Sequence, residues 1–364
     1  MKAAMTPRER FLAVLRGEEC DRIPAVSPTS VATVESMQAT GAYFPQAHLS
    51  ADKMAALAGV GYEVLGFDTV APYFSVQHEA AALGCTIDWG KRDELPSTAV
   101  SPINDPAEVR LTGGFLDARA TKTILTAIKL LRKKYGQDVA IIGKVIGPWT
   151  LTYHLHGINR FLLETVLEPE KVRDFLHVLK EASILFAEAQ FEAGADAVTW
   201  ADHPTADLVS AKIYEEFLLP VHKECTARLK KAGPLILHLC GPVEDRLASI
   251  STAGFDAFHL DSRNDPAAAI RLAAGRMLII GNINNPNVLL NGSLQDVRRA
   301  TADAMDSGVH MVAPECAVPC WTPNRNLAEI VRTVRLRHQH TGRSRVKGGS
   351  DDDWNNGWSA MRKN

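Results

Sequence analysis

Short apolar segments alternate with longer amphipathic segments along most of this 364-residue chain. The apolar segments are rich in β-branched residues and are bounded by Gly, Pro or polar residues, which predicts strands. The predicted strands are residues 21–26, 63–70, 139–145, 197–200, 234–239, 257–260, 277–281 and 309–313. Strands that are apolar throughout are typical of a parallel sheet that is buried on both faces.

The segments between the later strands have the spacing of amphipathic helices, commonly opened by Pro or Ser and closed near Gly. These predicted helices are residues 169–193, 211–231, 242–252, 266–273 and 294–306. Gly194, Gly254 and Gly308 each lie at a helix end just before a strand, as in the αβ turns of β/α units. Residues 6–9 form a capping-box pattern with proline at the first helical position, which predicts a further helix at the N-terminus.

Eight strands in a chain of this length favour a (β/α)8 TIM barrel with an N-terminal helical extension. An open doubly wound sheet is the alternative, but its glycine-rich first turn is not found. We expect a single barrel domain over residues 1–342 and a polar, glycine-rich tail over residues 343–364, which composition predicts to be mobile. Trp354 and Trp358 are four residues apart in this tail and could dock as one helical turn.

Composition narrows the partners and the compartment. A formal net charge of -2 gives no strongly basic surface, so nucleic acid is not expected as a partner. The N-terminal residues lack an apolar signal-peptide core, and no apolar run approaches the roughly 18 residues that span a bilayer, so we expect a soluble cytoplasmic protein with no membrane partner. Six cysteines in such a long chain do not form a dense disulfide framework, and in a reducing compartment they are free to bind metal.

Polar and metal-competent residues end nearly every predicted strand in the second half of the chain. In a barrel the catalytic groups lie at the carboxyl ends of the strands, so these side chains should meet at one mouth. The residues in question are Asp202, His203, His238, Cys240, Asp261, Asn282, Glu315 and Cys316.

His238, Cys240 and Cys316 are the strongest metal candidates. His238 and Cys240 are two residues apart, so they face the same side of an extended strand, and Cys316 ends a later strand. One imidazole and two thiolates suit Zn²⁺ rather than Mg²⁺ and leave a fourth position open, as catalytic zinc sites do. The alternative is structural: Cys is often buried as a small hydrophobe, and a histidine beside a core strand is often satisfied by the backbone.

Several residues compete for the fourth position and for the pocket walls. Asp261 could ligate zinc until substrate displaces it, or it could cap the helix that opens near residue 265. Glu315 could do the same or be a solvated loop carboxylate, and Cys320 is better interpreted as a pocket wall than as a ligand. We expect Asp202 and His203 to line the pocket as hydrogen-bonding catalytic groups, with Asn282 in contact with the cofactor.

A zinc ion with two thiolate ligands carries little net charge and is a poor Lewis acid. It is better suited to binding a thiol and lowering the pKa of that thiol, which makes thiol alkylation the natural reaction class. The methyl donor must then be an electrophilic carbon, and the chain has no glycine-rich nucleotide site that would supply one.

Several segments resemble the uroporphyrinogen decarboxylase superfamily, and within it the corrinoid-dependent methyltransferase branch typified by methylcobamide:coenzyme M methyltransferase. The similarity runs from Met5 to about His338, and the His-x-Cys with a distant Cys marks the methyltransferase branch. The matching segments are residues 6–11, 21–24, 79–85, 147–151, 194–202, 281–283 and 322–323.

The resemblance implies that His238, Cys240 and Cys316 hold zinc, which activates an acceptor thiol for attack on a methylcobamide carried by a separate corrinoid protein. It also implies that Asp261 fills the fourth position in the resting state. True decarboxylases carry an arginine-rich N-terminal signature that binds substrate carboxylates. Residues 26–31 contain no arginine, which argues against porphyrinogen decarboxylation.

Our hypothesis is a zinc methyltransferase that moves a methyl group between a corrinoid protein and a small acceptor, most simply a thiol such as coenzyme M. One alternative uses tetrahydrofolate or tetrahydromethanopterin as acceptor, or a methylated donor substrate. A second is a non-enzymatic chaperone or scaffold for a corrinoid protein. The sequence leaves open the acceptor, the direction of transfer and the oligomeric state.

Overall fold

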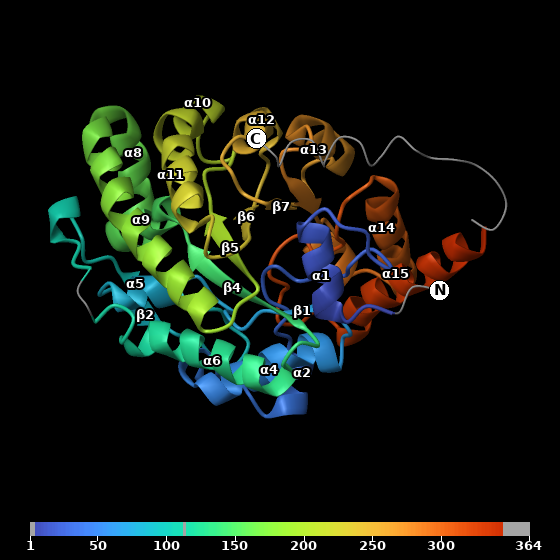
Figure 1. The fold of residues 1–364 in the computed structure, drawn as a ribbon. Helices are drawn as coiled ribbons and strands as arrows, with labels where there is room; N and C mark the ends of the chain where they lie inside the picture. The colour runs from blue at the N-terminus through green and yellow to red at the C-terminus, as the bar shows by residue number, and fades with distance from the viewer. Residues whose placement is uncertain (1–3, 112–113, 345–364) are drawn as a thin grey trace.

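A parallel sheet forms the centre of the computed structural model, which describes residues 4–111 and 114–344 (Figure 1). The six strands lie in the order β1-β4-β5-β6-β7-β8. They are β1 (Thr69–Val70), β4 (Ala140–Ile146), β5 (Ala197–Asp202), β6 (Leu235–Leu239), β7 (Ala257–Leu260) and β8 (Leu278–Ile280). The five predicted strands between residues 139 and 281 therefore agree with β4 to β8 to within two residues at either end.

Two bridged segments close this sheet into a barrel. Met311 bridges to Ile280, and Val312 bridges to Ala25, each in parallel orientation. The Asp68 N–H then donates to the Ala25 carbonyl at 2.8 Å, which brings the closure back to β1. Six strands and two bridged segments together fill the eight strand positions of a barrel, which confirms the predicted (β/α)8 barrel. The predicted strands at 21–26 and 309–313 were too long, because these segments form single bridges rather than ladders.

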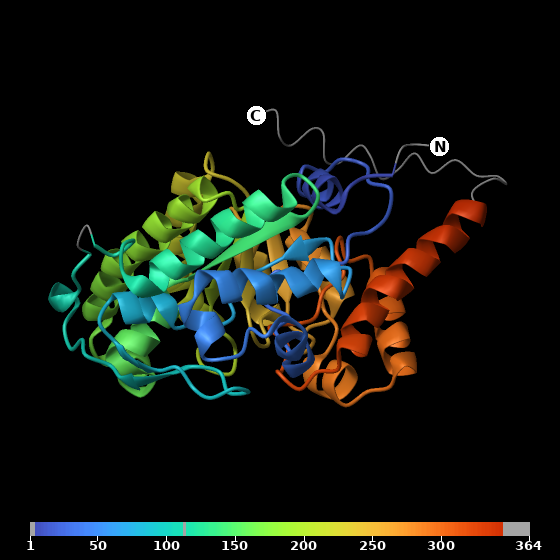
Figure 2. The ribbon, with the colours of Figure 1, turned by 90° about the horizontal axis from the view of Figure 1, so that it is seen from below.

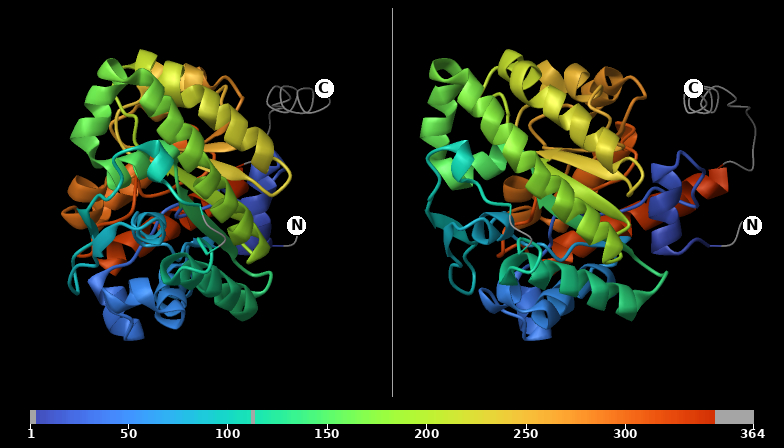
Figure 3. Two further views of the ribbon diagram at one scale, coloured as in Figure 1. Left: turned by 90° about the vertical axis from the view of Figure 1, so that its left-hand side faces the viewer. Right: turned by 60° about the vertical axis from the view of Figure 1, so that its left-hand side comes forward.

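Helices surround the sheet on its outer face (Figures 1 and 3). The barrel helices are α6 (Arg119–Tyr135), α9 (Pro169–Glu192), α11 (Leu219–Leu229), α12 (Leu247–Ile250), α13 (Pro266–Ala273), α14 (Leu294–Asp306) and α15 (Asn324–Ser344). Further helices are α2 (Val34–Thr40), α3 (Gln46–Leu49), α4 (Ala51–Glu63), α5 (His78–Ala82), α7 (Pro148–Thr152), α8 (Ile158–Leu167) and α10 (Ala211–Ile213). The predicted helix at 211–231 is built from α10, the π-helical turn η3 (Tyr214–Leu218) and α11 in succession.

The segment before β1 differs from the prediction. Residues 63–70 were expected to form a strand, but α4 extends to Glu63 and the strand is only Thr69–Val70. Met54, Leu57, Ala58 and Gly61 are buried with the three-to-four residue spacing of a helix, and α4 packs alongside α6 (Figure 2). An antiparallel pair, β2 (Thr86–Asp88) and β3 (Ser97–Val100), was also not predicted.

The N-terminal helix α1 (Pro7–Leu15) closes the amino end of the barrel. Its predicted capping box is present: the Thr6 hydroxyl accepts from the Glu9 N–H, and the Glu9 carboxylate accepts from the Thr6 N–H. Phe11 and Leu15 are buried with the inward-facing apolar side chains of the strands. These include Ala140, Ile142, Ala197, Ile236, Ala257, Leu278 and Ile280. Every second residue from these positions therefore faces the interior as each strand continues to the mouth.

A buried ion-pair cluster ties the N-terminal segments to the barrel. Asp68 is fully buried and accepts from Arg10 Nη1 at 2.7 Å and from Arg22 Nη2 at 2.8 Å. It also accepts from the Ala25 N–H at 2.9 Å. A buried carboxylate is stable only when it is paired and hydrogen-bonded, so Arg10 and Arg22 have a structural role here.

The sequence led us to expect no membrane-spanning segment and a mobile C-terminal tail. Within the described residues, no helix has the length and apolar character needed to cross a bilayer. The predicted mobile tail at 343–364, with Trp354 and Trp358, lies outside the described residues apart from its first two positions, which belong to α15.

Candidate metal centre

The structure brings His238, Cys240 and Cys316 together at the carboxyl end of the barrel. Their ligand atoms all lie within 4.8 Å of one another, and His238 Nε2 lies 3.3 Å from Cys316 Sγ. His238 is buried in β6 and the two cysteines are half-buried. His238 and Cys240 continue the inward-facing series of Ile236, which is why both side chains reach the same space as Cys316.

His259 of β7 orients the imidazole of His238. The His238 Nδ1–H donates to the carbonyl oxygen of His259 at 3.2 Å, which leaves Nε2 as the lone-pair nitrogen facing Cys316. The two rings also lie together, with centroids 4.6 Å apart. His259 Nε2 in turn donates to the Pro314 carbonyl at 2.7 Å. This contact joins β6 and β7 to the bridged segment 311–314 behind the ligands. Sequence reasoning missed this supporting role, since His259 was only one residue of a predicted strand.

The two thiols have opposite pKa shifts. The neighbouring Cys240 thiol chiefly, and the nearby His238, lower the pKa of Cys316. The proximity of Cys316, together with burial, raises the pKa of Cys240. The pair therefore loses its first proton easily and holds the second one. A divalent cation placed between the sulfurs would displace that second proton, because thiolates are the metal-binding form.

The donor set fits zinc. One imidazole nitrogen and two thiolate sulfurs are soft-to-borderline ligands, and three protein ligands are what catalytic zinc sites use. A zinc ion sits about 2.0–2.3 Å from such ligands, which matches donor atoms gathered in one small cluster. Across residues 4–111 and 114–344, no other group of three His, Cys, Asp or Glu side chains has this arrangement.

Asp261 lies beside the cluster but is held by an arginine. Its Oδ2 is 3.7 Å from Cys240 Sγ, and its Oδ1 accepts from the Arg263 N–H at 2.8 Å. The guanidinium of Arg263 pairs with Asp261 and also with Asp207. The alternative of a helix cap for Asp261 is wrong, because Asp265 is the residue that caps α13.

Glu315 and Cys320 are both buried, and neither belongs to the cluster of three metal candidates. Glu315 is buried and accepts from the Ser262 N–H at 3.0 Å and the Asn285 N–H at 2.6 Å. The interpretation as a solvated loop carboxylate is therefore wrong, because Glu315 joins the loops that follow β7 and β8. Cys320 is buried and lies outside the three-residue group.

Asp202 does not face the barrel mouth. Ala197 faces the interior, so the alternation places Asp202 on the outer face of β5, where it is fully buried. Its Oδ1 accepts from the N–H and the hydroxyl of Thr150 at 2.8 and 2.9 Å, and its Oδ2 lies 3.3 Å from His222 Nε2. A Cβ atom at Gly147 would lie 1.9 Å from this carboxylate, which explains the glycine before α7. The expectation that Asp202 lines the pocket was wrong in this respect.

His203 and Asn282 are closer to the cluster. His203 is half-buried with Nδ1 3.1 Å from the Thr150 hydroxyl; burial first, and then the nearby His238, lower its pKa. Asn282 donates through Nδ2 to the carbonyl oxygens of Asn264 at 3.1 Å and Asp261 at 3.4 Å. It therefore fixes the loop that carries Asp261.

Lys144 of β4 is a second residue at the mouth that sequence reasoning missed. It is buried, and its electrostatic influence reaches Cys316, His203 and His238. The available signal was a lysine inside the otherwise apolar run at 139–145.

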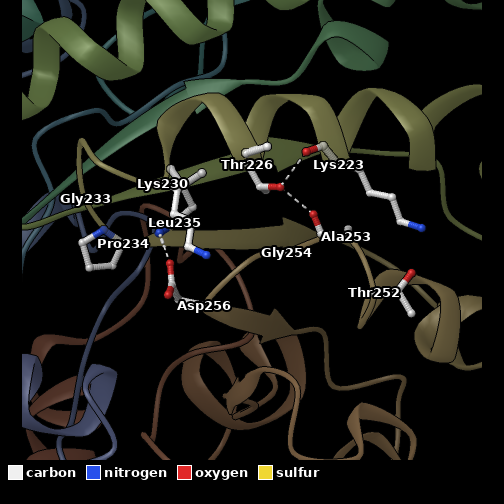
Figure 4. Close-up of a pocket in the computed structure, with 11 residues that line it drawn as sticks. Lys223, Thr226, Lys230, Gly233, Pro234, Leu235, Thr252, Ala253, Gly254 and Asp256 are labelled. Carbon is white, nitrogen blue, oxygen red and sulfur yellow. Dashed lines mark hydrogen bonds between the residues drawn. The ribbon is translucent and has the colours of Figure 1, made fainter. Parts of the chain in front are cut away.

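A separate pocket of about 460 Å³ lies at the opposite end of the barrel (Figure 4). It is lined by Lys223, Thr226 and Lys230 of α11 and by residues at the start of β6 and β7. Thr226 Oγ1 donates to the Ala253 carbonyl at 2.6 Å, and Asp256 accepts from the Leu235 N–H at 2.9 Å. The amino end of a (β/α)8 barrel serves stability rather than catalysis, and none of the three metal candidates lines this pocket.

Known proteins resemble this chain along most of its length. The family described as uroporphyrinogen decarboxylase (URO-D) matches residues 6–336. The methylcobamide:CoM methyltransferase MtbA of Methanosarcina acetivorans is 34% identical over 334 residues, which cover 91% of this chain and 98% of the relative. A methylated-thiol–coenzyme M methyltransferase of Methanosarcina mazei is 32% identical over 337 residues, covering 92% and 90%. A solved methyltransferase structure from Methanosarcina mazei has a TM-score of 0.89 at 28% identity, covering 92% and 99%.

Proposed function

The chain belongs to the uroporphyrinogen decarboxylase family, and from this we propose that it is a corrinoid-dependent methyltransferase which transfers a methyl group between a methylcobamide and a small thiol. The observation that carries the proposal is the cluster of His238, Cys240 and Cys316 at the barrel mouth. The relatives named for methylcobamide:CoM and methylated-thiol–coenzyme M transfer support coenzyme M as the simplest acceptor. By the same argument, a separate corrinoid protein would present the methylcobamide at this mouth.

We further propose that His238 Nε2 and the sulfurs of Cys240 and Cys316 hold a zinc ion. When bound, zinc would lower the pKa of the acceptor thiol and hold its sulfur as a nucleophile for the methyl carbon. His259 keeps the lone pair of His238 Nε2 directed into the cluster through its carbonyl oxygen. The lowered pKa of Cys316 favours the thiolate form in which this side chain binds a cation.

Asp261 is our candidate for the resting occupant of the fourth position. Its carboxylate already lies 3.7 Å from Cys240 Sγ, and it is only 4% exposed. Arg263 pairs with the same carboxylate, so the charge of Asp261 stays compensated when an acceptor takes its place. We propose that His203, whose pKa is influenced by His238 and Cys316, hydrogen-bonds to the acceptor.

Methylcobalamin demethylation tests the proposed reaction. The purified protein is mixed with methylcobalamin and, separately, with coenzyme M, 2-mercaptoethanol or tetrahydrofolate, and the corrinoid spectrum is followed. We expect demethylation with the thiols and none with tetrahydrofolate. Demethylation with tetrahydrofolate but not with the thiols would show that the acceptor is a pterin. Release of carbon dioxide from uroporphyrinogen, in a separate assay, would show that the protein is a decarboxylase instead of a methyltransferase.

A further inference from the structure

Lys144 points into the barrel interior, the face of the sheet that also carries His238. The neighbouring Gly143 faces outward, because a Cβ atom there would lie 2.4 Å from Gln190 Oε1 of α9. Gln190 uses this space to reach the strand: it accepts from the Lys144 N–H at 2.9 Å and donates to the Lys144 carbonyl at 2.8 Å. Successive residues of a strand point to opposite faces, so the Lys144 side chain is directed inward, where it is 4% exposed.

The ammonium group of Lys144 has an aromatic neighbour but no ion pair among residues 4–111 and 114–344. Its Nζ lies 4.6 Å from the centroid of the Tyr73 ring, a cation–π distance. Glu79 is the buried carboxyl group nearby, but its oxygens accept from the Tyr73 hydroxyl and from the Ile146 N–H at 2.8 Å. A buried, charged lysine without a carboxylate partner is costly unless another anion compensates it.

The charge of Lys144 influences, and is influenced by, groups of the candidate metal centre. Burial lowers the pKa of Lys144 to about 8, while Cys316 and then Glu79 act to raise it. Lys144 and His238 also both contribute to lowering the pKa of His203. The alternation that directs His238 of β6 into the barrel also directs Lys144 of β4 there, and the charge of Lys144 acts on His203, His238 and Cys316.

Charge balance gives this arrangement a function. Zinc with two thiolates and a neutral imidazole has no net charge, so a third thiolate from the acceptor adds one uncompensated negative charge to a buried site. We propose that Lys144 supplies the counter-charge for the acceptor thiolate, and so makes this site selective for thiols that bind in the ionised form. The acceptor R–SH gives its proton to solvent and enters as R–S⁻, while Lys144 keeps its own proton. This inference rests on the proposed function.

The test compares charge variants of Lys144 in binding rather than in turnover. The protein is loaded with Co²⁺ in place of zinc, and 2-mercaptoethanol or coenzyme M is titrated while the thiolate-to-cobalt charge-transfer absorption is recorded. Lys144→Met and Lys144→Gln remove the charge, and Lys144→Arg restores it. Lys180→Met is the matched control, because Lys180 is an equally buried lysine that pairs with Glu224 at 2.6 Å on the helix layer.

We expect Lys144→Met and Lys144→Gln to keep the cobalt but to bind both thiols at least about tenfold more weakly, as loss of one nearby charge in a partly buried site implies. Lys144→Arg should recover most of this affinity, and Lys180→Met should match the wild type. Unchanged affinity for both thiols in the uncharged variants overturns the inference. So does a loss confined to coenzyme M, since Lys144 would then bind the sulfonate. A wild-type protein that binds no cobalt, or no thiol, refutes the proposed function itself.

Discussion

His238 Nε2 and Cys316 Sγ lie 3.3 Å apart although 78 residues separate them in the sequence. His238 belongs to β6 and Cys316 follows the bridged segment 311–314, so closure of the barrel is what brings them together. The backbone carbonyl of His259 fixes the histidine ring from behind. The proximity is therefore a property of the whole fold.

Asp261→Ala tests the resting fourth position. We expect the variant to retain zinc through His238, Cys240 and Cys316, and to bind an acceptor thiol several-fold more tightly, because no carboxylate has to be displaced. Metal analysis and thiol titration measure the two effects. Asp207→Ala is the control, since Asp207 is the other carboxylate that pairs with Arg263. Thiol affinity that stays unchanged in Asp261→Ala would remove Asp261 from the fourth position.

Asp202→Ala tests the outward placement of this carboxylate. The substitution leaves Thr150 and His222 without a buried acceptor, so we expect a loss of about 2–4 kcal/mol in the free energy of unfolding. The folded fraction should keep its KM for the thiol. Urea unfolding and steady-state kinetics give the two numbers, with Thr150→Val as a milder variant that removes only the hydroxyl contact. Full stability combined with a loss of kcat would return Asp202 to the catalytic groups.

The sequence predicted the convergence of the cluster because carboxyl ends of parallel strands meet at one rim, whatever the details of the loops. It could not predict the direction of Asp202, because a strand that is apolar on both faces does not reveal which residues face inward. Lys144 was hidden for the same reason, inside the run at 139–145. The sequence also left open whether Asp261 caps α13, a role that Asp265 has in the structure, since caps depend on local turns that apolar periodicity does not define.

Buried histidines should make the fold sensitive to acid. Burial lowers the pKa of His48 to about 2 and that of His259 to about 3, from an ordinary value of 6.5. Between pH 6.5 and 4 the unfolded chain therefore binds protons that the folded chain does not, and stability falls as the pH falls. Each such histidine contributes up to about 1.4 kcal/mol per pH unit.

His48→Phe isolates one of these contributions. The His48 ring stacks on Phe44 with centroids 4.1 Å apart, and neither of its nitrogens has a hydrogen-bond partner among the residues that the structure describes, so a phenyl ring suits the site. Urea unfolding at several pH values should give a slope between pH 6.5 and 4 that is shallower than that of the wild type by up to one proton. His177→Phe is the control, because that ring is exposed in the folded protein. An identical slope for His48→Phe and wild type would contradict the assignment.

Zinc content of the purified protein, measured together with Cys316→Ser, tests the central claim most directly. We expect about one equivalent of zinc in the wild type and in Cys320→Ser, whose cysteine lies outside the cluster. Cys316→Ser should lose most of the metal and, with it, methyl transfer from methylcobalamin to a thiol. A wild-type protein without zinc, together with a Cys316→Ser variant that transfers methyl groups as well as the wild type, would contradict the account.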